Sequence, residues 1–347
     1  YAMIEKFLIS RHDSLYLAWP DVALLPSGTL VCTFMRCIHH GNRQYTALCV
    51  TESADRGRTW SAPRALVEDQ GDAYWNCARI SRLRDGRLVI VCDHIVGWEH
   101  RQDDKLTNHL WFSGDDGATW DGPHDTPAIG IVPDKLLDLP DGRWLLSCHR
   151  RSPEHNFLEP RLWISADGGA TWSDAITIAS REGLHLCEGS ILPLPDGTLV
   201  CYLRENSSQG WDAYKAISDD GGLTWHGPYR APLPACHRPV AGLLQSGKVL
   251  ITHRFMQGGK GWVGAWTQNF FAALTDVESA KATERKDQWS RILPVDFDRS
   301  PHSDLGYSGW VQFPDGEIYI VNYIVDDWPR GQIRGYSLRE SEFLLEA

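Results

Sequence analysis

The sequence predicts an all-β protein, a six-bladed β-propeller whose blades are four-stranded antiparallel sheets. Three observations predict it: an eight-residue turn motif occurs four times, a glycine turn between apolar stretches occurs six times, and Trp and Gly are abundant while Met is scarce. The glycine turns recur at intervals of roughly 50 to 70 residues, which suits four antiparallel strands and their loops. No linker interrupts the series, so we expect residues 1–347 to form a single domain.

The turn motif is Ser-x-Asp-x-Gly-x-Thr-Trp. Asp and Ser side chains hydrogen-bond to the backbone of tight turns, Gly supplies a positive φ, and Trp offers a large surface for packing between blades. The four copies run from Ser53 to Trp60, Ser113 to Trp120, Ser165 to Trp172 and Ser218 to Trp225, with a degenerate trace at Thr275, Asp276 and Trp289. The motif thus identifies architecture, and we assign it no catalytic role.

The glycine turn connects two apolar stretches in each of six places. A Pro two residues before the Gly sets φ at the turn entry in four copies, and Gly supplies the positive φ that a hairpin connection requires. The six glycines are Gly28, Gly86, Gly142, Gly197, Gly247 and Gly316. Six such turns predict six blades.

Composition and charge exclude some functions. Charged residues make up 23% of the chain and its formal net charge is -11, which argues against a nucleic-acid partner because phosphate binding needs a basic face. A small anionic substrate stays possible, since a few Arg in a pocket can oppose the global sign. The sequence contains no run of about 18 apolar residues, so it predicts no membrane-spanning helix. The sequence leaves the oligomeric state open.

The nine cysteines and the first residues bear on the cellular compartment. Several cysteines, such as Cys32 and Cys201, lie inside apolar runs, so we expect reduced thiols rather than a disulfide framework. The chain opens Tyr1-Ala2-Met3-Ile4-Glu5 with no secretory leader. If Met3 is the natural start, we expect a cytoplasmic protein; a signal peptide removed earlier is the alternative.

Aligning the six turn glycines selects candidate pocket residues. A strand pair runs from one face to the turn and back, so residues before its first strand and after its second emerge together at the opposite face. Nine positions before the glycines stand Trp19, Cys77, Pro133, Glu188, Arg238 and Tyr307. Seven positions after them stand Met35, Asp93, His149, Arg204, Arg254 and Tyr323, followed one step later by Arg36, His94 and Arg150. This polar ring predicts a central site, because unpaired charges are costly near a core; mutual pairing at a solvated rim is the alternative.

Repeated motifs of this kind in a six-fold β array resemble the Asp boxes of the sialidase (neuraminidase) superfamily, over nearly the whole chain. The segment from His185 to Arg204 is similar to the one that supplies that family's glutamate and one substrate-binding arginine. Gly306-Tyr307-Ser308 is similar to the segment with its catalytic tyrosine. The resemblance implies that Glu188 is the base for a Tyr307 nucleophile. It also implies that Arg204, with Arg238 or Arg254, binds the substrate carboxylate.

Two departures from the family pattern stand in the first repeat. Ala18 occupies the place where that family has its first arginine, so the arginine clamp is incomplete. The stretch from Arg36 to Gly41 contains no Asp where the family has its acid. His39, His40 and Asp21 are the candidate replacements.

The full set of candidates follows from these observations. The candidate catalytic residues are Tyr307, Glu188, Asp21, His39 and His40, and the candidate substrate-binding residues are Arg36, Arg204, Arg238, Arg254, Arg79, Asp93, His94, His149 and Arg150. Histidine is abundant on this face, yet no His-x-x-x-His or comparable spacing occurs, so we expect neither a metal nor another cofactor.

Three functions remain open at this point. The first is a glycosidase acting on an acidic sugar such as a sialic acid. The second is a polysaccharide lyase or a related carbohydrate-active enzyme that uses His and Tyr as acid and base on a uronate. The third is a non-catalytic glycan-binding propeller, because a fold does not fix a function. All three imply a carbohydrate partner.

Overall fold

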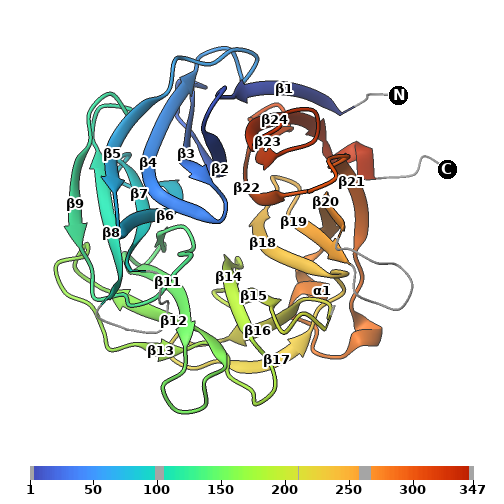
Figure 1. Cartoon of the computed structure of the whole chain (residues 1–347). Coiled ribbons are helices and arrows are strands. Elements are labelled where there is room, and N and C mark those ends of the chain that lie inside the picture. The colour runs from blue at the N-terminus through green and yellow to red at the C-terminus, as the bar shows by residue number, and fades with distance from the viewer. Residues whose placement is uncertain (1–3, 98–104, 210, 258–266, 344–347) are drawn as a thin grey trace.

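The computed structural model describes residues 4–97, 105–209, 211–257 and 267–343. It consists of six four-stranded sheets, all with antiparallel neighbours, arranged around a central axis (Figure 1). The first strand of each blade lies nearest the centre and the fourth lies outermost. The predicted six-bladed β-propeller is confirmed.

Each blade except the last is formed by four consecutive strands. The first blade holds β2(Tyr16–Leu24), β3(Leu30–His39), β4(Asn42–Ser53) and β5(Arg64–Gln70), and the second β6(Ala73–Arg82), β7(Leu88–Val96), β8(Leu106–Ser113) and β9(Asp121–Asp125). The third holds β10(Leu137–Asp138), β11(Trp144–Arg151), β12(Leu158–Ser165) and β13(Ile176–Thr177), and the fourth β14(Leu186–Pro193), β15(Leu199–Glu205), β16(Tyr214–Ser218) and β17(His226–Arg230). The fifth holds β18(Cys236–Leu243), β19(Val249–Gln257), β20(Thr267–Thr275) and β21(Arg291–Phe297).

The sixth blade joins the two ends of the chain. It holds β22(Leu305–Gln312), β23(Glu317–Ile324), β24(Gln332–Arg339) and, as its outer strand, β1(Glu5–Ser10). Strand β1 runs antiparallel to β24 beside it, with Glu5 opposite Ser337 (Figure 1). Lys6 of β1 also pairs with Asp296 of β21 at 2.5 Å, so the first strand is tied to two blades. The start of the chain thereby supplies the outer strand of the last blade and closes the ring.

Burial falls from the centre of the ring outwards. All eight residues of β23 are buried, whereas β5 alternates between half-buried and exposed side chains. The buried apolar residues lie within and between the blades. Outside the strands lie helix α1 (Val277–Lys281) and two short 3₁₀ turns, Arg285–Asp287 and Glu340–Phe343.

The four turn motifs share one hydrogen-bond pattern, shown by the first copy. The Asp55 carboxylate accepts hydrogen bonds from Ser53 Oγ at 2.8 Å, from the Thr59 amide at 2.9 Å and from Thr59 Oγ1 at 2.6 Å. The Trp60 indole donates to the carbonyl of Gly57 at 3.1 Å. Hydrogen bonds from Thr59 lower the pKa of Asp55 to about 2, so this solvent-exposed carboxylate stays ionised in the fold. The motifs are structural, as predicted.

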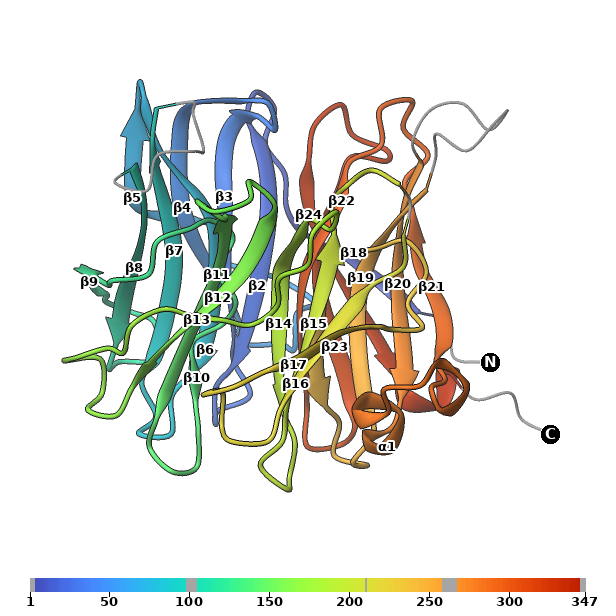
Figure 2. The same cartoon turned by 90° about the horizontal axis from the view of Figure 1, so that it is seen from below.

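The glycine turns lie together at one face of the ring. At the first, φ of Gly28 is 88° and its amide donates to the carbonyl of Leu25 at 2.9 Å. The strands run from this face to the opposite one, as the side view shows (Figure 2). The starts of the inner strands and the ends of the second strands therefore meet at the face away from the turns.

All nine cysteines are buried and none of them is paired. Within the described part of the chain, no helix is long and apolar enough to cross a membrane.

Candidate active site

A β-bulge in the inner strand places the central side chains. The strand register shifts between Ala18 and Asp21 in β2, between Cys187 and Ser190 in β14, between His237 and Val240 in β18 and between Gly306 and Gly309 in β22. Each of these bulges contains a non-glycine residue with positive φ: Trp19 at 53°, Glu188 at 48°, Arg238 at 50° and Tyr307 at 58°. Bulges re-aim side chains, and L-residues adopt this conformation only at a cost. Four of the six residues aligned nine positions before the turns thus share one unusual backbone geometry.

Glu188, Arg204 and Tyr307 converge from the fourth and sixth blades. Tyr307 Oη donates a short hydrogen bond to Glu188 Oε1, although 119 positions separate the two residues. Arg204 Nη1 donates to the same Oε1 at 2.7 Å and to Tyr307 Oη at 3.4 Å. The structure therefore brings together three of the residues that the sequence selected.

The protonation states of Glu188 and Tyr307 follow from their surroundings. Burial alone raises the pKa of Glu188, but the charges of Arg204 and His149 outweigh it and hold that pKa far below its usual range. Burial, with Glu188 adding to it, raises the pKa of Tyr307 well above its usual value. The pair is thus a neutral phenol beside a carboxylate. Glu188 Oε2 is buried and has no hydrogen-bond partner among the described residues.

Arg254 is the second arginine at this centre. Its guanidinium lies 5.4 Å from the ring centroid of Tyr307 and donates to Leu305 O at 3.2 Å. Its Nη2 contacts His237 Nδ1 at 3.4 Å. Burial, with Arg204 and Arg254 adding to it, lowers the pKa of His237 far below its usual value, so this imidazole is neutral. His237 is not among the candidate residues selected from the sequence.

Arg238 does not face a substrate pocket. It is fully buried, and its Nη1 and Nη2 donate to the backbone carbonyls of Gly189 at 3.1 Å and Pro133 at 2.8 Å. Its guanidinium lies 6.0 Å from the Tyr307 ring centroid. Arg238 therefore ties three blades together next to Tyr307. Of the two arginines that the sequence offered for the carboxylate, Arg254 is the one that stays available.

Asp21 and Arg79 form a separate buried cluster, which corrects their selection as site residues. Asp21 is completely buried, and its carboxylate pairs with Arg79 at 3.3 Å and with Lys135 at 3.1 Å. It also accepts the amide of Ile80 at 3.0 Å, and Arg79 donates to the carbonyl of Ser308 at 2.8 Å. Both residues hold blades together and have no exposed surface for a substrate.

Asp93 and His149 are also enclosed. Asp93 accepts hydrogen bonds from Asn76 Nδ2 at 2.8 Å and from the amides of Cys77 and Val132 at 2.7 and 2.9 Å, and burial raises its pKa. It is a connector between blades rather than a substrate ligand. His149 Nδ1 accepts the amide of Glu188 at 3.3 Å, so His149 positions Glu188 from behind.

The candidates that stand eight positions after the turn glycines contact residues away from the centre. Arg36 Nη2 contacts Tyr45 Oη at 2.9 Å and Glu68 at 3.1 Å, and His94 pairs with Asp69 at 2.5 Å. Arg150 lies opposite Glu159 in the register of β11 and β12. Successive side chains of a strand point to opposite sides, so positions seven and eight after the turn cannot both face the centre. Arg36 and His94 therefore belong to the outer part of the rim.

Asp304 is the acidic residue that the sequence reasoning missed. Its Oδ2 accepts Tyr16 Oη at 2.5 Å and contacts His40 Nδ1, while its Oδ1 accepts Tyr323 Oη at 2.8 Å. Arg254 lies 3.9 Å from Oδ1, so Asp304 and Tyr307 share this arginine. Asp304 precedes its strand and stands twelve positions before the turn glycine, outside the aligned positions.

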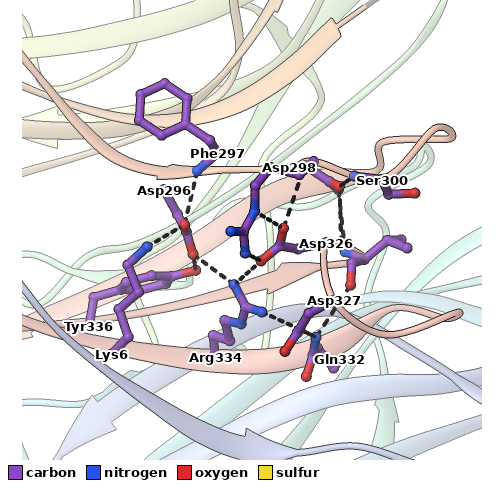
Figure 3. A network of polar contacts seen from close by, with 12 residues as sticks. Lys6, Asp296, Phe297, Asp298, Ser300, Asp326, Asp327, Gln332, Arg334 and Tyr336 are labelled. Atoms are coloured by element: carbon purple, nitrogen blue, oxygen red, sulfur yellow. Dashed lines mark hydrogen bonds and ion pairs between the residues drawn. The ribbon is translucent and has the colours of Figure 1, made fainter.

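Asp298 holds the loop that carries Asp304. Its carboxylate accepts four backbone amides: Ser300 at 2.9 Å, Asp304 at 2.9 Å, Val325 at 3.3 Å and Asp326 at 3.0 Å. Figure 3 shows this anchor beside the ion pairs of Arg334 with Asp296 and Asp326. The loops before β22 and after β23 are thereby fixed to each other.

A cavity of about 840 Å³ opens beside Asp304, between the first and sixth blades. Tyr16, His39 and Asp304 line it together with Asp327 and Trp328. It lies on the face opposite the glycine turns, next to the centre but not on Glu188.

Trp19 and Arg43 occupy the first-blade side of the centre, where the sequence lacks an arginine. The guanidinium of Arg43 lies 3.9 Å from the Trp19 ring centroid and donates to Asn76 Oδ1 at 3.0 Å. Arg43 comes from β4, the third strand, so alignment of the first two strands could not reveal it. Among the described residues, no group of three His, Cys, Asp or Glu side chains is placed to hold a metal ion.

Comparisons with known proteins point to one family. A family model described as BNR repeat-like domain matches residues 68–320. The sialidase of Clostridium perfringens is 23% identical over 267 residues, covering 68% of this chain and 65% of that protein. The chain thus spans slightly less than two thirds of the length of this relative.

Solved structures extend the likeness of fold to almost the whole chain. A Dyadobacter fermentans protein of unknown function matches with a TM-score of 0.77 at 20% identity, over 97% of this chain and 99% of that chain. The intramolecular trans-sialidase of Ruminococcus gnavus matches with a TM-score of 0.72 at 14% identity, over 96% of each chain. At such identities these matches show the fold alone.

Proposed function

We propose, on the premise that this chain belongs to the BNR repeat-like family of the sialidase superfamily, that it is a glycosidase acting on an acidic sugar such as a sialic acid. The observation that carries the proposal is the convergence of Tyr307 and Arg204 on one oxygen of Glu188. This arrangement supplies a nucleophile, its base and a cation at a single point.

Tyr307 is the nucleophile in this proposal and Glu188 its base. An anomeric carbon that already carries a carboxylate repels an anionic nucleophile, which favours a neutral phenol. The phenol needs a base at the moment of attack, because its own pKa is raised. Glu188 is ionised and already accepts its hydrogen bond, so the proton moves along an existing contact.

Arg204 and Arg254 bind the substrate carboxylate. Both guanidinium groups adjoin Tyr307 and come from the equivalent ends of β15 and β19. A planar guanidinium donates in a fork that matches a carboxylate. Arg238 is buried and is not a ligand of the carboxylate in this proposal. The proposal thus uses two arginines and dispenses with the absent first-blade arginine.

Hydrolysis is favoured over elimination. The relative from Clostridium perfringens named above is a sialidase, and its name does not refer to a lyase. The Tyr307 and Glu188 pair also fits nucleophilic attack, since the carboxylate removes the proton of the phenol itself.

The test is release of the aryl alcohol from an aryl α-glycoside of N-acetylneuraminic acid. We expect turnover by the wild type and a loss of about 10²-fold or more in Tyr307→Phe. Tyr45→Phe is the matched control, because Tyr45 also contacts an arginine and a glutamate, Arg36 and Glu68, but at the outer rim.

Two outcomes would contradict the proposal. One is inactivity of the wild type on aryl glycosides of sialic acids and of other acidic sugars. The other is glycan binding in calorimetry that shows no turnover and is insensitive to Tyr307→Phe, which identifies a binding module.

A further inference from the structure

We propose that His40, held by Asp304, protonates the oxygen of the departing group, and that the departing sugar lies in the adjacent cavity between the first and sixth blades. This inference rests on the proposed glycosidase function. It assigns a proton donor to a chain whose first repeat has no Asp in the stretch from Arg36 to Gly41.

Asp304 fixes the orientation of His40. The ring contacts Asp304 Oδ2 through Nδ1. A carboxylate on one nitrogen of an imidazole sets the tautomer and leaves the other nitrogen for proton transfer. Nε2 of His40 has no hydrogen-bond partner among the described residues, and the side chain is 42% exposed. His40 can therefore present Nε2 to a bound molecule.

Asp304 itself is a positioning residue. Both of its oxygens are occupied, Oδ1 by Tyr323 and Oδ2 by Tyr16 and His40. The hydrogen bond and the charge of His40 outweigh burial and lower the pKa of Asp304, so it stays ionised and carries no proton to give. Its role is to hold the His40 ring through Nδ1.

The dyad of His40 and Asp304 adjoins the nucleophile. The His40 ring packs edge-on against Trp19, with 5.3 Å between centroids, and Trp19 lies 6.0 Å from Tyr323. Tyr323 in turn lies 6.4 Å from Tyr307. His40 thus belongs to the first blade and Tyr307 to the neighbouring sixth blade, with Trp19 and the buried Tyr323 between them. In this proposal a sugar bound at the rim between these two blades meets the nucleophile from the sixth blade and the acid from the first.

The cavity gives the departing sugar a place on the acid's side. Its volume of about 840 Å³ is within the range of pockets that bind small molecules. Tyr16 and Asp304 form one part of its lining and Trp328 another. The Trp328 ring also carries the Arg11 guanidinium at 4.7 Å, which fixes its orientation. An indole beside carboxylates suits a sugar, whose C–H face packs on the ring while its hydroxyls meet the carboxylates.

The proton inventory balances over two steps. In the first, the bond from the Tyr307 oxygen to the anomeric carbon forms and the phenolic proton passes to Glu188. The bond to the leaving oxygen breaks, its electron pair stays on that oxygen, and the oxygen takes the proton of His40 Nε2. In the second, neutral His40 removes a proton from the attacking water, the tyrosyl bond breaks, and Glu188 returns its proton to Tyr307.

The experiment compares two substrates in one enzyme preparation. One is the activated aryl sialoside, whose leaving group needs little protonation, and the other is sialyllactose, whose sugar leaving group needs much. We expect His40→Gln to lower kcat/KM for sialyllactose by about 10²- to 10³-fold and for the aryl sialoside by less than about tenfold. The deciding quantity is the ratio of kcat/KM for sialyllactose to kcat/KM for the aryl sialoside. Asp304→Asn should lower this ratio by a smaller factor than His40→Gln does. The ratio does not depend on the folded fraction, so partial misfolding of a variant cannot produce it.

His124→Gln is the matched control, because His124 contacts Asp121 at 2.9 Å on the exposed part of the second blade. It should leave both rates unchanged. Equal losses on both substrates in His40→Gln would overturn the proton-donor role while leaving the glycosidase proposal standing. A leaving-group-dependent loss in His39→Gln instead of His40→Gln would also overturn it. A wild type that is inactive on both substrates would reject the glycosidase function first and the inference with it.

Discussion

Glu188 and Tyr307 occupy the same position in two different blades, and one hydrogen bond joins them. Each stands nine residues before its turn glycine, inside a bulge of the inner strand, with φ of 48° and 58°. The shared distortion turns both side chains to the centre, where Arg204 completes the group. The strained backbone is a local cost that the closed ring can sustain.

We predict that Glu188→Gln lowers kcat on the aryl sialoside by about 10²- to 10³-fold. The amide cannot take the phenolic proton of Tyr307, while Arg204 and Arg254 still bind the substrate, so KM should change less than kcat. Steady-state kinetics provides the measurement. Glu68→Gln, the glutamate of the outer pair with Tyr45, should keep the wild-type rate. Retention of more than a tenth of the wild-type kcat in Glu188→Gln would exclude Glu188 as the base.

Much of the fold could be predicted because its signals are local. Asp55 and its three counterparts bind amides within four residues of themselves, and Gly28 closes a turn with Leu25. Such contacts depend on the order of a few neighbouring residues, which the sequence displays directly. Counting the turns therefore gave the number of blades.

The candidate site could be predicted only where the blades repeat one geometry. Glu188 and Tyr307 follow from the shared bulge, whereas Asp21 and Arg79 lie just beyond equivalent bulges and are turned into the buried contacts between blades. Asp304 escaped alignment because it lies in a loop whose position depends on Asp298. Long-range partners of this kind leave no periodic signal in a single sequence.

We predict that Gly309→Ala is more destabilising than Gly28→Ala. A Cβ at Gly309 would lie 1.8 Å from Asp21 Oδ1 and 2.9 Å from Asp21 Cα. Asp21 cannot retreat without breaking its buried pairs with Arg79 and Lys135, so we expect a loss of about 3 kcal/mol or more.

At Gly28 a Cβ would meet nothing within 4 Å. The loss of stability in Gly28→Ala therefore comes from the positive φ of 88° alone and is about 1 to 2 kcal/mol. Urea unfolding of the two variants separates the steric cause from the backbone cause. Equal losses would show that the contact between Asp21 and Gly309 is loose.

The buried Lys215 should make the stability of the protein depend on pH. Its side chain is fully buried and Nζ donates to the carbonyls of Ser279 and Ala280 at 3.0 and 2.7 Å. Burial lowers its pKa from 10.5 to about 7. Between these two values the unfolded chain binds a proton at this position that the folded chain has released, so the free energy of unfolding contributed by Lys215 rises as pH increases from about 7 to about 10.5.

The slope approaches 1.4 kcal/mol per pH unit at most. The buried cysteines, whose raised pKa values act in the opposite direction above about pH 8.5, keep their effect in Lys215→Met. Subtracting the urea unfolding free energy of Lys215→Met from that of the wild type therefore isolates the lysine. We expect this difference to increase with pH across the window. A difference that stays flat would show that the two carbonyls keep Lys215 charged in the folded protein.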